Sequence, residues 1–249
     1  MVVKGFQRVS LIDYPGKIAA VVFTSGCNFR CPYCHNRDLV LNPNSLETVP
    51  EEEIFEYLKK RKGLIEGVCI TGGEPTLQED LFDFVGKIKR LRLLVKLDTN
   101  GSNPSALEHL IAKDLIDYVA LDVKAPLDER YVQSVGIKRF DPVLILSSVK
   151  ALVRSKIDYE LRTTIVPPLH KKKDLVDMAA HLSSLTPHSL LRQGYRGQAS
   201  SLKWYLQQFQ PGNCLNLGFE EIRPYSRAEL EELLVSVRKY MPETELRGA

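Results

Sequence analysis

The sequence predicts an α/β protein built around a mostly parallel sheet. Six apolar runs rich in β-branched residues alternate along the chain with segments of helical periodicity. These runs are apolar on both faces, which is typical of strands buried between helices, and such strands form right-handed βαβ units. Because six repeats are too few for a closed eight-stranded barrel, the pattern leaves a partial barrel and an open doubly wound sheet as alternatives.

The predicted elements follow one another in a regular order. Residues 1–17 contain an apolar run closed by Pro15-Gly16, which predicts a short hairpin that leads into the first strand. The predicted strands are 18–24, 67–71, 93–98, 118–123, 159–166 and 203–209. The predicted helices are 51–62, 77–90, 104–113, 142–156, 174–185 and 227–240. We expect a single domain over residues 1–249, with a mobile polar loop at 187–201.

Composition excludes several classes of protein. The 249 residues suffice to bury a core, and the net charge of +3 is too small to indicate nucleic acid as a partner. No apolar run approaches the ~18 residues of a membrane span, so we expect no membrane association. The N-terminus has no hydrophobic signal segment, which predicts a cytoplasmic protein. Five cysteines, odd in number and clustered, argue against a disulfide framework.

Three cysteines form the main motif of the chain. Cys27, Cys31 and Cys34 lie within eight residues, directly after the first predicted strand. Thiolates are soft ligands that select zinc, copper(I) or iron–sulfur clusters. Three thiolates hold three irons of a four-iron cluster and leave one iron open to a substrate. We therefore interpret these cysteines as ligands of such a cluster.

The same residues fit other kinds of site. Cys31-Pro32-Tyr33-Cys34 is also the C-x-x-C of thioredoxin-like redox proteins, but this interpretation leaves Cys27 without a role. With His35 the run matches a haem attachment signature, which requires export. His35 could complete a zinc site, although it adjoins Cys34 and neighbouring side chains rarely converge on one ion. Zinc and dithiol chemistry remain the alternatives.

Polar or glycine-rich residues follow or end each predicted strand. In parallel α/β proteins ligands gather at the carboxyl ends of the strands, so these residues predict a binding site. In chain order they are Cys27, Thr71-Gly72-Gly73-Glu74-Pro75, Asp98-Thr99-Asn100-Gly101, Asp122-Val123-Lys124, Arg162 before Val166-Pro167, and Gln208-Phe209-Gln210. Taken singly, Gly-Gly-Glu-Pro is also typical of a turn, and Asp98 and Asn100 are also good helix caps.

C-x3-C-x2-C followed by Gly-Gly-Glu-Pro resembles the radical S-adenosylmethionine (SAM) superfamily. Residues 97–101, 122–126 and 161–167 are similar to segments of the pyruvate formate-lyase activating enzyme and of activating proteins for anaerobic ribonucleoside-triphosphate reductase. This resemblance implies the partial (β/α)6 barrel, with its N-terminal hairpin, rather than the doubly wound sheet.

The resemblance also implies roles for individual residues. Cys27, Cys31 and Cys34 would hold a [4Fe–4S] cluster, and its open iron would bind SAM. A monovalent cation would lie on Asp98, Thr99 and Asp122. The residues implied in SAM binding are Tyr33, His35, Asn36, Gly72, Gly73, Glu74, Asp98, Thr99, Asn100, Asp122, Lys124 and Arg162. Three other residues are given no part in this site: Cys69 is expected to be a core thiol, Cys214 has no assigned role, and His170 is expected to begin a solvated helix.

The implied function is that of a radical SAM activase. Such an enzyme cleaves SAM reductively and abstracts a hydrogen atom from a glycine of a partner, here expected to be anaerobic ribonucleoside-triphosphate reductase. The expected electron donor is a flavodoxin or a ferredoxin. One alternative is a radical SAM enzyme that acts on a small molecule or an RNA base, like 7-carboxy-7-deazaguanine synthases. The other is a non-enzymatic iron–sulfur or dithiol carrier that uses Cys31 and Cys34.

Overall fold

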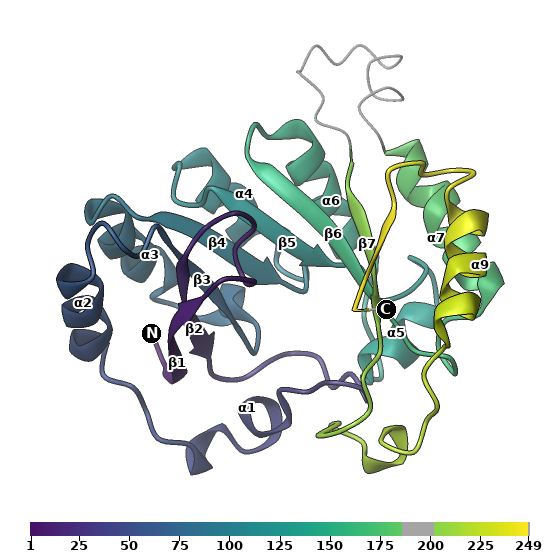
Figure 1. Ribbon diagram of the computed structural model, residues 1–249, viewed down its shortest axis with the longest axis horizontal. Coiled ribbons are helices and arrows are strands. Elements are labelled where there is room, and N and C mark those ends of the chain that lie inside the picture. Colours follow the sequence, from purple (N-terminus) through teal and green to yellow (C-terminus); the bar gives the residue numbers. More distant parts are fainter. Residues whose placement is uncertain (186–201, 249) are drawn as a thin grey trace. The chain divides into compact units, whose positions relative to one another are not determined.

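Parallel strands joined by helices make up most of the structure, a computed structural model that describes residues 1–185 and 202–248 (Figure 1). In this part of the chain, eight strands follow one another in the sheet in chain order, β1 to β8. The described residues group into two compact units. The first contains residues 1–28, 36–99 and 105–120, and the second contains 29–35, 100–104 and the described residues from 121 onward. The single domain expected over residues 1–249 stays a prediction.

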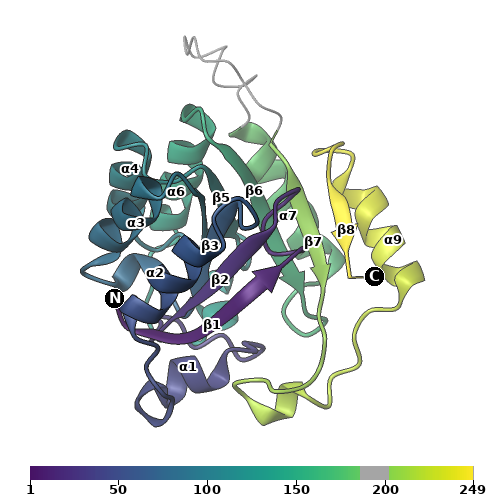
Figure 2. The ribbon, with the colours of Figure 1, turned by 60° about the vertical axis from the view of Figure 1, so that its left-hand side comes forward.

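The first unit begins with an antiparallel pair and continues with parallel strands. β1 pairs antiparallel with β2, and β2 to β4 pair in parallel. Figure 2 shows β1 and β2 as neighbouring arrows that run in opposite directions. The elements that begin in this unit, together with α4 and β5 at its boundary, are β1 (Val3–Ser10), β2 (Ala19–Thr24), α1 (Arg37–Leu41), η1 (Pro43–Ser45), α2 (Glu51–Lys60), β3 (Gly67–Gly72), η2 (Pro75–Leu77), α3 (Leu81–Arg90), β4 (Leu94–Thr99), α4 (Pro104–Ala112) and β5 (Tyr118–Asp122).

The second unit is parallel where its strand pairings are described. β6 pairs with β7 and β7 with β8, both in parallel. Helices α7 and α9 lie side by side (Figure 1). The remaining elements are α5 (Arg130–Val135), α6 (Val143–Arg154), β6 (Asp158–Ile165), α7 (Lys172–Ser184), β7 (Trp204–Gln208), η3 (Leu217–Phe219), α9 (Arg227–Val237) and β8 (Glu245–Arg247).

The predicted fold class is confirmed: the chain forms an open, mostly parallel α/β sheet. Strands β2 to β7 are the six predicted strands, and their observed ends differ from the predicted ends by at most one residue. The N-terminal hairpin is made by β1 together with β2, so residues 1–17 supply one of its two strands. β8 was missed because three residues are too few to show a pattern.

The helix predicted over 77–90 is wrong at its start. Residues Pro75–Leu77 form a 3₁₀ turn, and the α-helix begins at Leu81. The turn forms because the Glu74 carboxylate accepts the backbone N–H of Thr76 and caps it. The predicted loop at 187–201 lies wholly outside the described residues.

Burial explains why the strands could be found. In β2, the residues Ala19, Ala20, Val21 and Val22 are all 0% exposed, so both faces of the strand are covered. Cys69 in β3 is also 0% exposed, which agrees with the core thiol expected there. Each fully buried valine side chain adds about 1.5–3 kcal/mol to the free energy of unfolding.

Candidate functional site

The cysteine loop joins β2 to α1. Cys31 is 6% exposed, and Cys27 and Cys34 are half-buried. The N–H of Cys34 donates to the Cys31 carbonyl at 3.0 Å, which closes a turn between these two residues. The backbone of 215–216 holds this turn from the other side, since the Leu215 N–H donates to the Cys34 carbonyl at 3.0 Å. Backbone contacts therefore hold the second and third cysteines in place.

A glycine lets a helix end approach the loop closely. Gly136 caps α5 with a φ of +65°, and a Cβ at this position would lie 2.1 Å from the Arg30 carbonyl oxygen. The Arg30 N–H donates to the Val135 carbonyl at 2.8 Å. Any side chain at Gly136 would push the loop away, so this glycine is required by the close approach.

The donor chemistry of the loop fits an iron–sulfur cluster, because three thiols alternate there with residues that carry no competing carboxylate. Within residues 1–185 and 202–248, no group of three or more His, Cys, Asp or Glu side chains is arranged to hold a metal ion. The assignment of Cys27, Cys31 and Cys34 as cluster ligands therefore stays a prediction.

Gly72 and Gly73 bring the end of β3 against the start of the cysteine loop. A Cβ on Gly73 would lie 1.7 Å from the Gly26 carbonyl oxygen, and one on Gly72 would lie 2.5 Å from the Thr24 nitrogen. The N–H groups of Gly73 and Glu74 donate to the carbonyls of Thr24 and Gly26, at 2.9 and 2.8 Å. The Gly-Gly-Glu segment thus fixes the backbone directly before Cys27.

The carboxylate of Glu74 accepts hydrogen bonds from nearby residues of the chain. Glu74 is 1% exposed, and its Oε1 accepts the N–H and the hydroxyl of Thr76 at 3.1 and 2.6 Å. The hydroxyl of Thr99, at the end of β4, donates to the same oxygen at 2.7 Å. Glu74 therefore ties the ends of β3 and β4 together, and its role toward SAM stays a prediction.

The two residues that follow Cys34 anchor the loop at different places. The side-chain N–H of Asn36 donates to the Gly72 carbonyl at 2.7 Å, so this amide links the cysteine loop to the Gly-Gly segment. His35 is exposed, and its Nε2 donates to the Gln210 carbonyl at 2.7 Å. The His35 ring also stacks on Phe209, with ring centroids 6.3 Å apart. Both side chains hold the loop in place, and their predicted cofactor contacts remain untested.

Lys96 is a residue that the sequence analysis missed. It is 2% exposed in β4, and its ammonium contacts the carboxylate of Asp98 on the same face of the strand. Its Nζ lies 3.8 Å from the Sγ of Cys69 in β3, the residue paired with it across the sheet. The signal was a single lysine inside an otherwise apolar run, Leu93 to Leu97. Asp98, which is predicted to bind a monovalent cation, thus forms an ion pair with the Lys96 ammonium.

Asp122 lies between two cations in the second unit. Its two oxygens accept from Arg162 Nε at 2.9 Å and from Lys124 Nζ at 3.2 Å. Burial raises the pKa of Asp122, but Arg162 and Lys124 outweigh it and hold the pKa below its ordinary value. Burial lowers the pKa of Lys124, whereas Asp122 followed by Cys31 raises it well above the usual range. All three groups are therefore ionised near neutral pH.

The hydroxyl of Tyr33 is a buried polar group that a bound cofactor could pair with. Its hydroxyl has no hydrogen-bond partner among the described residues, and Tyr33 is 6% exposed. Burial, followed by the nearby Cys31, raises the pKa of this hydroxyl well above its ordinary value, so it stays protonated. Buried polar groups are nearly always paired in folded proteins. A polar atom of a cofactor bound beside the loop would satisfy this hydroxyl.

His170 is buried, in contrast to the solvated position expected for it. It is 0% exposed, and its Nδ1 accepts the Val166 N–H at 3.1 Å. Its Nε2 must then carry the proton, which it donates to the Lys124 carbonyl at 2.8 Å. His170 thus joins the end of β6 to the segment that carries Lys124. The expectation was wrong because the three lysines after His170 mark exposed positions, whereas the ring turns inward.

Asn100 also acts locally. It is 6% exposed, and its Oδ1 accepts the Ser102 N–H at 2.9 Å, which closes a turn after β4. This geometry favours a structural role, and the predicted contact of Asn100 with SAM remains untested.

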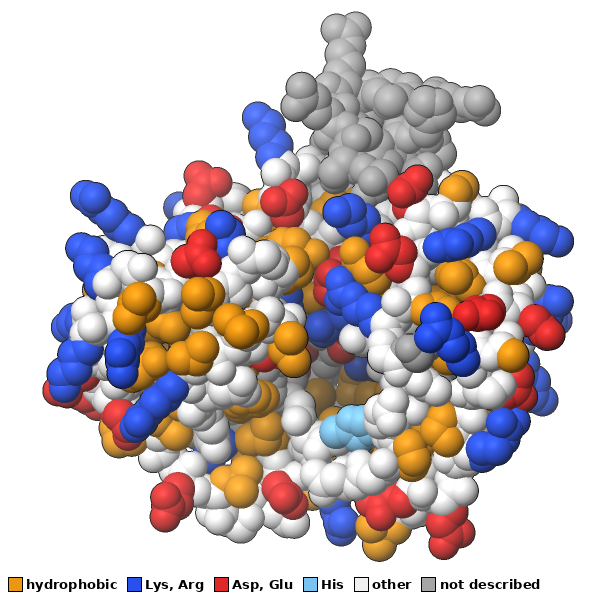
Figure 3. Space-filling view, viewed as in Figure 1, with side chains coloured by type: hydrophobic (Ala, Val, Ile, Leu, Met, Phe, Trp, Pro, Cys, Tyr) orange, Lys and Arg blue, Asp and Glu red, His pale blue; other side chains and the backbone are white. Residues whose placement is uncertain are grey.

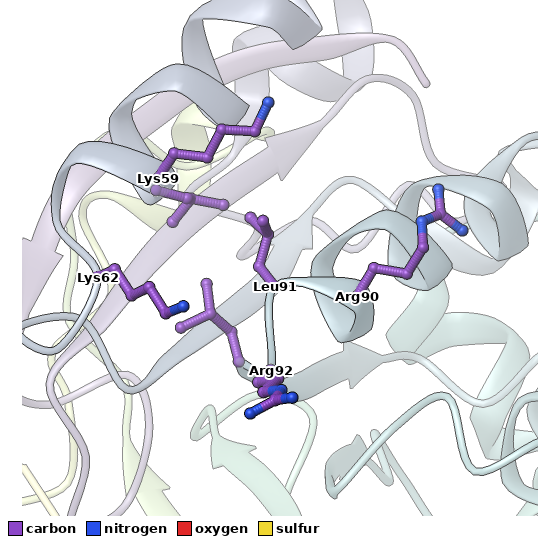
Figure 4. A pocket seen from close by; sticks show the side chains of 7 residues that line it. Lys59, Lys62, Arg90, Leu91 and Arg92 are labelled. Carbon is purple, nitrogen blue, oxygen red and sulfur yellow. The ribbon is translucent and has the colours of Figure 1, made fainter.

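A basic pocket lies at the other ends of β3 and β4. It has a volume of about 370 Å³, and Figure 4 shows Lys59, Lys62, Arg90 and Arg92 around Leu91. These residues precede β3 and β4, whereas the predicted site residues follow them. A six-residue strand separates the two ends by about 20 Å. The pocket is therefore distinct from the predicted site.

The surface charge gives no further indication of a partner. Figure 3 shows Lys and Arg side chains interspersed with Asp and Glu over the face in view, in keeping with the net charge of +3. Among the described residues, no helix has the length and apolar character needed to cross a membrane.

Comparison with known proteins identifies relatives of this arrangement. Residues 21–183 match the family model of the radical SAM superfamily. A Methanocaldococcus jannaschii protein named as a glycyl-radical enzyme activating enzyme is 33% identical over 249 residues, covering 98% of this chain and 95% of that protein. The pyruvate formate-lyase-activating enzyme of Clostridium pasteurianum is 30% identical, covering 72% of this chain and 75% of that enzyme.

A solved structure shares the fold. Streptococcus suis SuiB bound to the precursor peptide SuiA superposes with a TM-score of 0.66 at 15% identity, over 92% of this chain. The match spans 48% of the SuiB chain, so this chain corresponds to about half of that protein. At this identity the likeness concerns the fold alone.

Proposed function

Because this chain belongs to the radical SAM superfamily, we propose that it activates a glycyl-radical enzyme, with anaerobic ribonucleoside-triphosphate reductase as its partner. Its family makes it an enzyme that uses a [4Fe–4S] cluster and SAM. A cytoplasmic location and an electron donor of the flavodoxin or ferredoxin type belong to the same proposal.

One observation carries the proposal. The similarity to the M. jannaschii activating enzyme extends over 98% of the chain, well beyond the 163 residues that match the superfamily model, counted from 21 to 183. A resemblance limited to the cluster loop would indicate the cofactor alone. A resemblance over the whole chain also includes the segments outside the cofactor site, which supports a shared type of substrate.

The residues of the site would have separate roles in binding the cluster and SAM. Cys27, Cys31 and Cys34 would ligate the cluster, and Gly73 fixes the backbone before them. Lys124 and Arg162, which both pair with Asp122, would orient a carboxylate of SAM. When bound, the cluster and SAM supply the radical chemistry, and the protein supplies binding, orientation and exclusion of water.

The first experiment tests the chemistry. We would reconstitute the cluster anaerobically, add SAM and a reductant, and measure 5′-deoxyadenosine formation by wild type, Cys31→Ala and Cys69→Ala. We expect product from wild type and Cys69→Ala, because Cys69 is a core thiol outside the loop. Product from Cys31→Ala at the wild-type rate would contradict the cluster assignment.

A second experiment tests the partner. Purified anaerobic ribonucleoside-triphosphate reductase would be added to the active protein, and the formation of a glycyl radical would be followed by electron paramagnetic resonance. A radical on the reductase, absent with Cys31→Ala, is the expected result. Active SAM cleavage without a radical on the reductase would point instead to the small-molecule or RNA-base alternative.

A further inference from the structure

We propose that the ammonium of Lys96 serves as a built-in cation at Asp98, so that SAM binding by this chain requires no monovalent metal ion. The inference rests on the proposed use of SAM and concerns a residue to which neither the motif nor the comparisons give a role. It replaces the metal cation predicted at Asp98 with a charge supplied by the chain.

The geometry places the two charges in contact. Lys96 and Asp98 are two residues apart in β4, so their side chains leave the same face of the strand. The side chain of Lys96 is 3% exposed and that of Asp98 is 13% exposed. The ammonium contacts Oδ1 of Asp98 directly. Both charges are therefore removed from water and compensate one another inside the unit.

Besides Asp98, the hydrogen-bond neighbour described for the Lys96 ammonium is Cys69. Cys69, its neighbour across the sheet, is a thiol at 3.8 Å and accepts a hydrogen bond only weakly. A buried ammonium is strongly disfavoured unless a carboxylate or several acceptors compensate it. Asp98 meets this need from within the same strand, which makes the pair independent of any added ion.

A metal cation at Asp98 would compete with this pair. Potassium and sodium prefer hard oxygen ligands, and a carboxylate is the charged ligand that such a site would need. An ion bound to Asp98 would also lie within a few ångströms of the Lys96 ammonium, and like charges repel strongly in a buried site. The residues present therefore fit an ammonium better than a metal cation.

The test compares salts. SAM binding to cluster-loaded protein would be measured by isothermal titration calorimetry in potassium, sodium and tetramethylammonium chloride at equal concentration. We expect the dissociation constant of the wild type to agree within about twofold among the three salts. The variant Lys96→Met keeps the length of the side chain and loses its charge. It should bind about tenfold more weakly in tetramethylammonium, and potassium or sodium should restore its binding.

A second readout does not involve SAM. The midpoint of thermal unfolding, Tm, should be the same for wild type in all three salts, whereas potassium or sodium should raise the Tm of Lys96→Met. Lys87→Met is the matched control, because Lys87 is a half-exposed lysine paired with Glu51 in the same unit. Its Tm and SAM binding should show no preference among the salts.

The outcomes separate this inference from the proposed function. Failure of the wild type to bind SAM in every salt would contradict the proposed function, and the thermal comparison would still test Lys96. Wild-type affinity or Tm that rises with potassium or sodium, relative to tetramethylammonium, would overturn the inference. If Lys96→Met does not fold, the double variant Lys96→Met/Asp98→Asn removes both charges, and its Tm should show no preference among the salts. A salt preference in that variant would also overturn the inference.

Discussion

Single buried polar residues connect the segments of this site. His170 bridges the Val166 N–H and the Lys124 carbonyl, and the Tyr225 hydroxyl donates to the His170 carbonyl at 2.9 Å. Burial lowers the pKa of His170 below its ordinary value of about 6.5. The neutral ring is required because Nδ1 must accept a hydrogen bond from the Val166 N–H. His170 is therefore a positioning residue for the segment that carries Lys124.

This arrangement predicts a pH dependence of stability. Below about pH 6.5 the unfolded chain binds a proton at His170 while the folded protein still excludes it, so the free energy of unfolding falls as the pH decreases. Above that pH both states are neutral and the contribution is constant. Urea unfolding of wild type and His170→Gln at several pH values should show a smaller loss of stability in the variant below about pH 6.5. Equal pH slopes would contradict the proposed neutral role.

Glycine positions give a second prediction at this scale. Ala at Gly73 would place a Cβ 1.7 Å from the Gly26 carbonyl oxygen, so the backbone before Cys27 must move. We expect Gly73→Ala to lose cluster binding, measured as iron content and absorbance after reconstitution, and to unfold more easily by at least 2 kcal/mol, an order-of-magnitude estimate.

Gly86 supplies the control for this substitution. It lies within helix α3, where the nearest atom to an added Cβ is a flexible Arg90 nitrogen at 3.8 Å. Alanine is favoured over glycine in a helix by about 0.5–1 kcal/mol, so Gly86→Ala should be neutral or stabilising and should load the cluster normally. Loss of the cluster in both variants would show that the close approach of the backbone at Gly73 is not the cause.

Residues differ in how far the sequence could reveal them. The cysteines and Gly72-Gly73-Glu74 were found because their roles depend on spacing along the chain. Lys96 and His170 were missed because their roles depend on contacts that form only in the folded chain. Lys96 contacts Asp98, two residues further along the same strand, and His170 contacts Lys124 on another segment. Glu74 was found, but the acceptance of three hydrogen bonds by its Oε1 could not be inferred from a motif.

At the scale of elements, continuous apolar runs predicted the strands, whereas the short helices were not predicted. α1 has five residues and α5 has six, too few for a helical period to repeat. The error at the start of α3 has a different cause, because the Glu74 cap formed a 3₁₀ turn where periodicity favoured a helix. Element type was thus predictable where burial imposed a pattern, and boundaries depended on side-chain caps.

The end of α3 contains a strained residue that predicts a stabilising change. Arg92 has a φ of +62° just after the helix, the left-handed position that glycine usually occupies. A non-glycine residue there costs about 1–2 kcal/mol, part of which the greater freedom of glycine in the unfolded chain offsets. Arg92→Gly also removes one of four cations around the basic pocket.

We therefore expect Arg92→Gly to raise the free energy of unfolding by about 0.5–1 kcal/mol, measured by urea unfolding. Asp114→Gly provides the comparison, since Asp114 has a similar φ of +52° in the turn after α4. Aspartate tolerates this region better than arginine, so its replacement should gain less. A larger gain for Asp114→Gly, or a loss for Arg92→Gly, would contradict this account of strain.

At the scale of the whole molecule, topology could be predicted further than the site. Alternating strands and helices admitted two architectures, and the resemblance in the cysteine and Gly-Gly-Glu motifs selected the open barrel that the strand order agrees with. The positions of individual side chains could not be derived this way, because strand order places residues at the same edge of a sheet without fixing their contacts. The ion pairs of Asp98 and Asp122 illustrate this difference.

The last prediction concerns the stability of the whole fold. A ligand that binds the folded protein and not the unfolded chain stabilises the fold by mass action, by about 2.7 kcal/mol at one hundred times its dissociation constant. Because the backbone of 215–216 and the Gly-Gly-Glu segment already hold the cysteine loop, loading the cluster should require little rearrangement and should raise Tm by several degrees. Anaerobic calorimetry of iron-loaded and iron-free protein measures this shift. Cys69→Ala should retain it and Cys31→Ala should lose most of it, whereas an equal shift in both variants would mean that iron binds outside the loop.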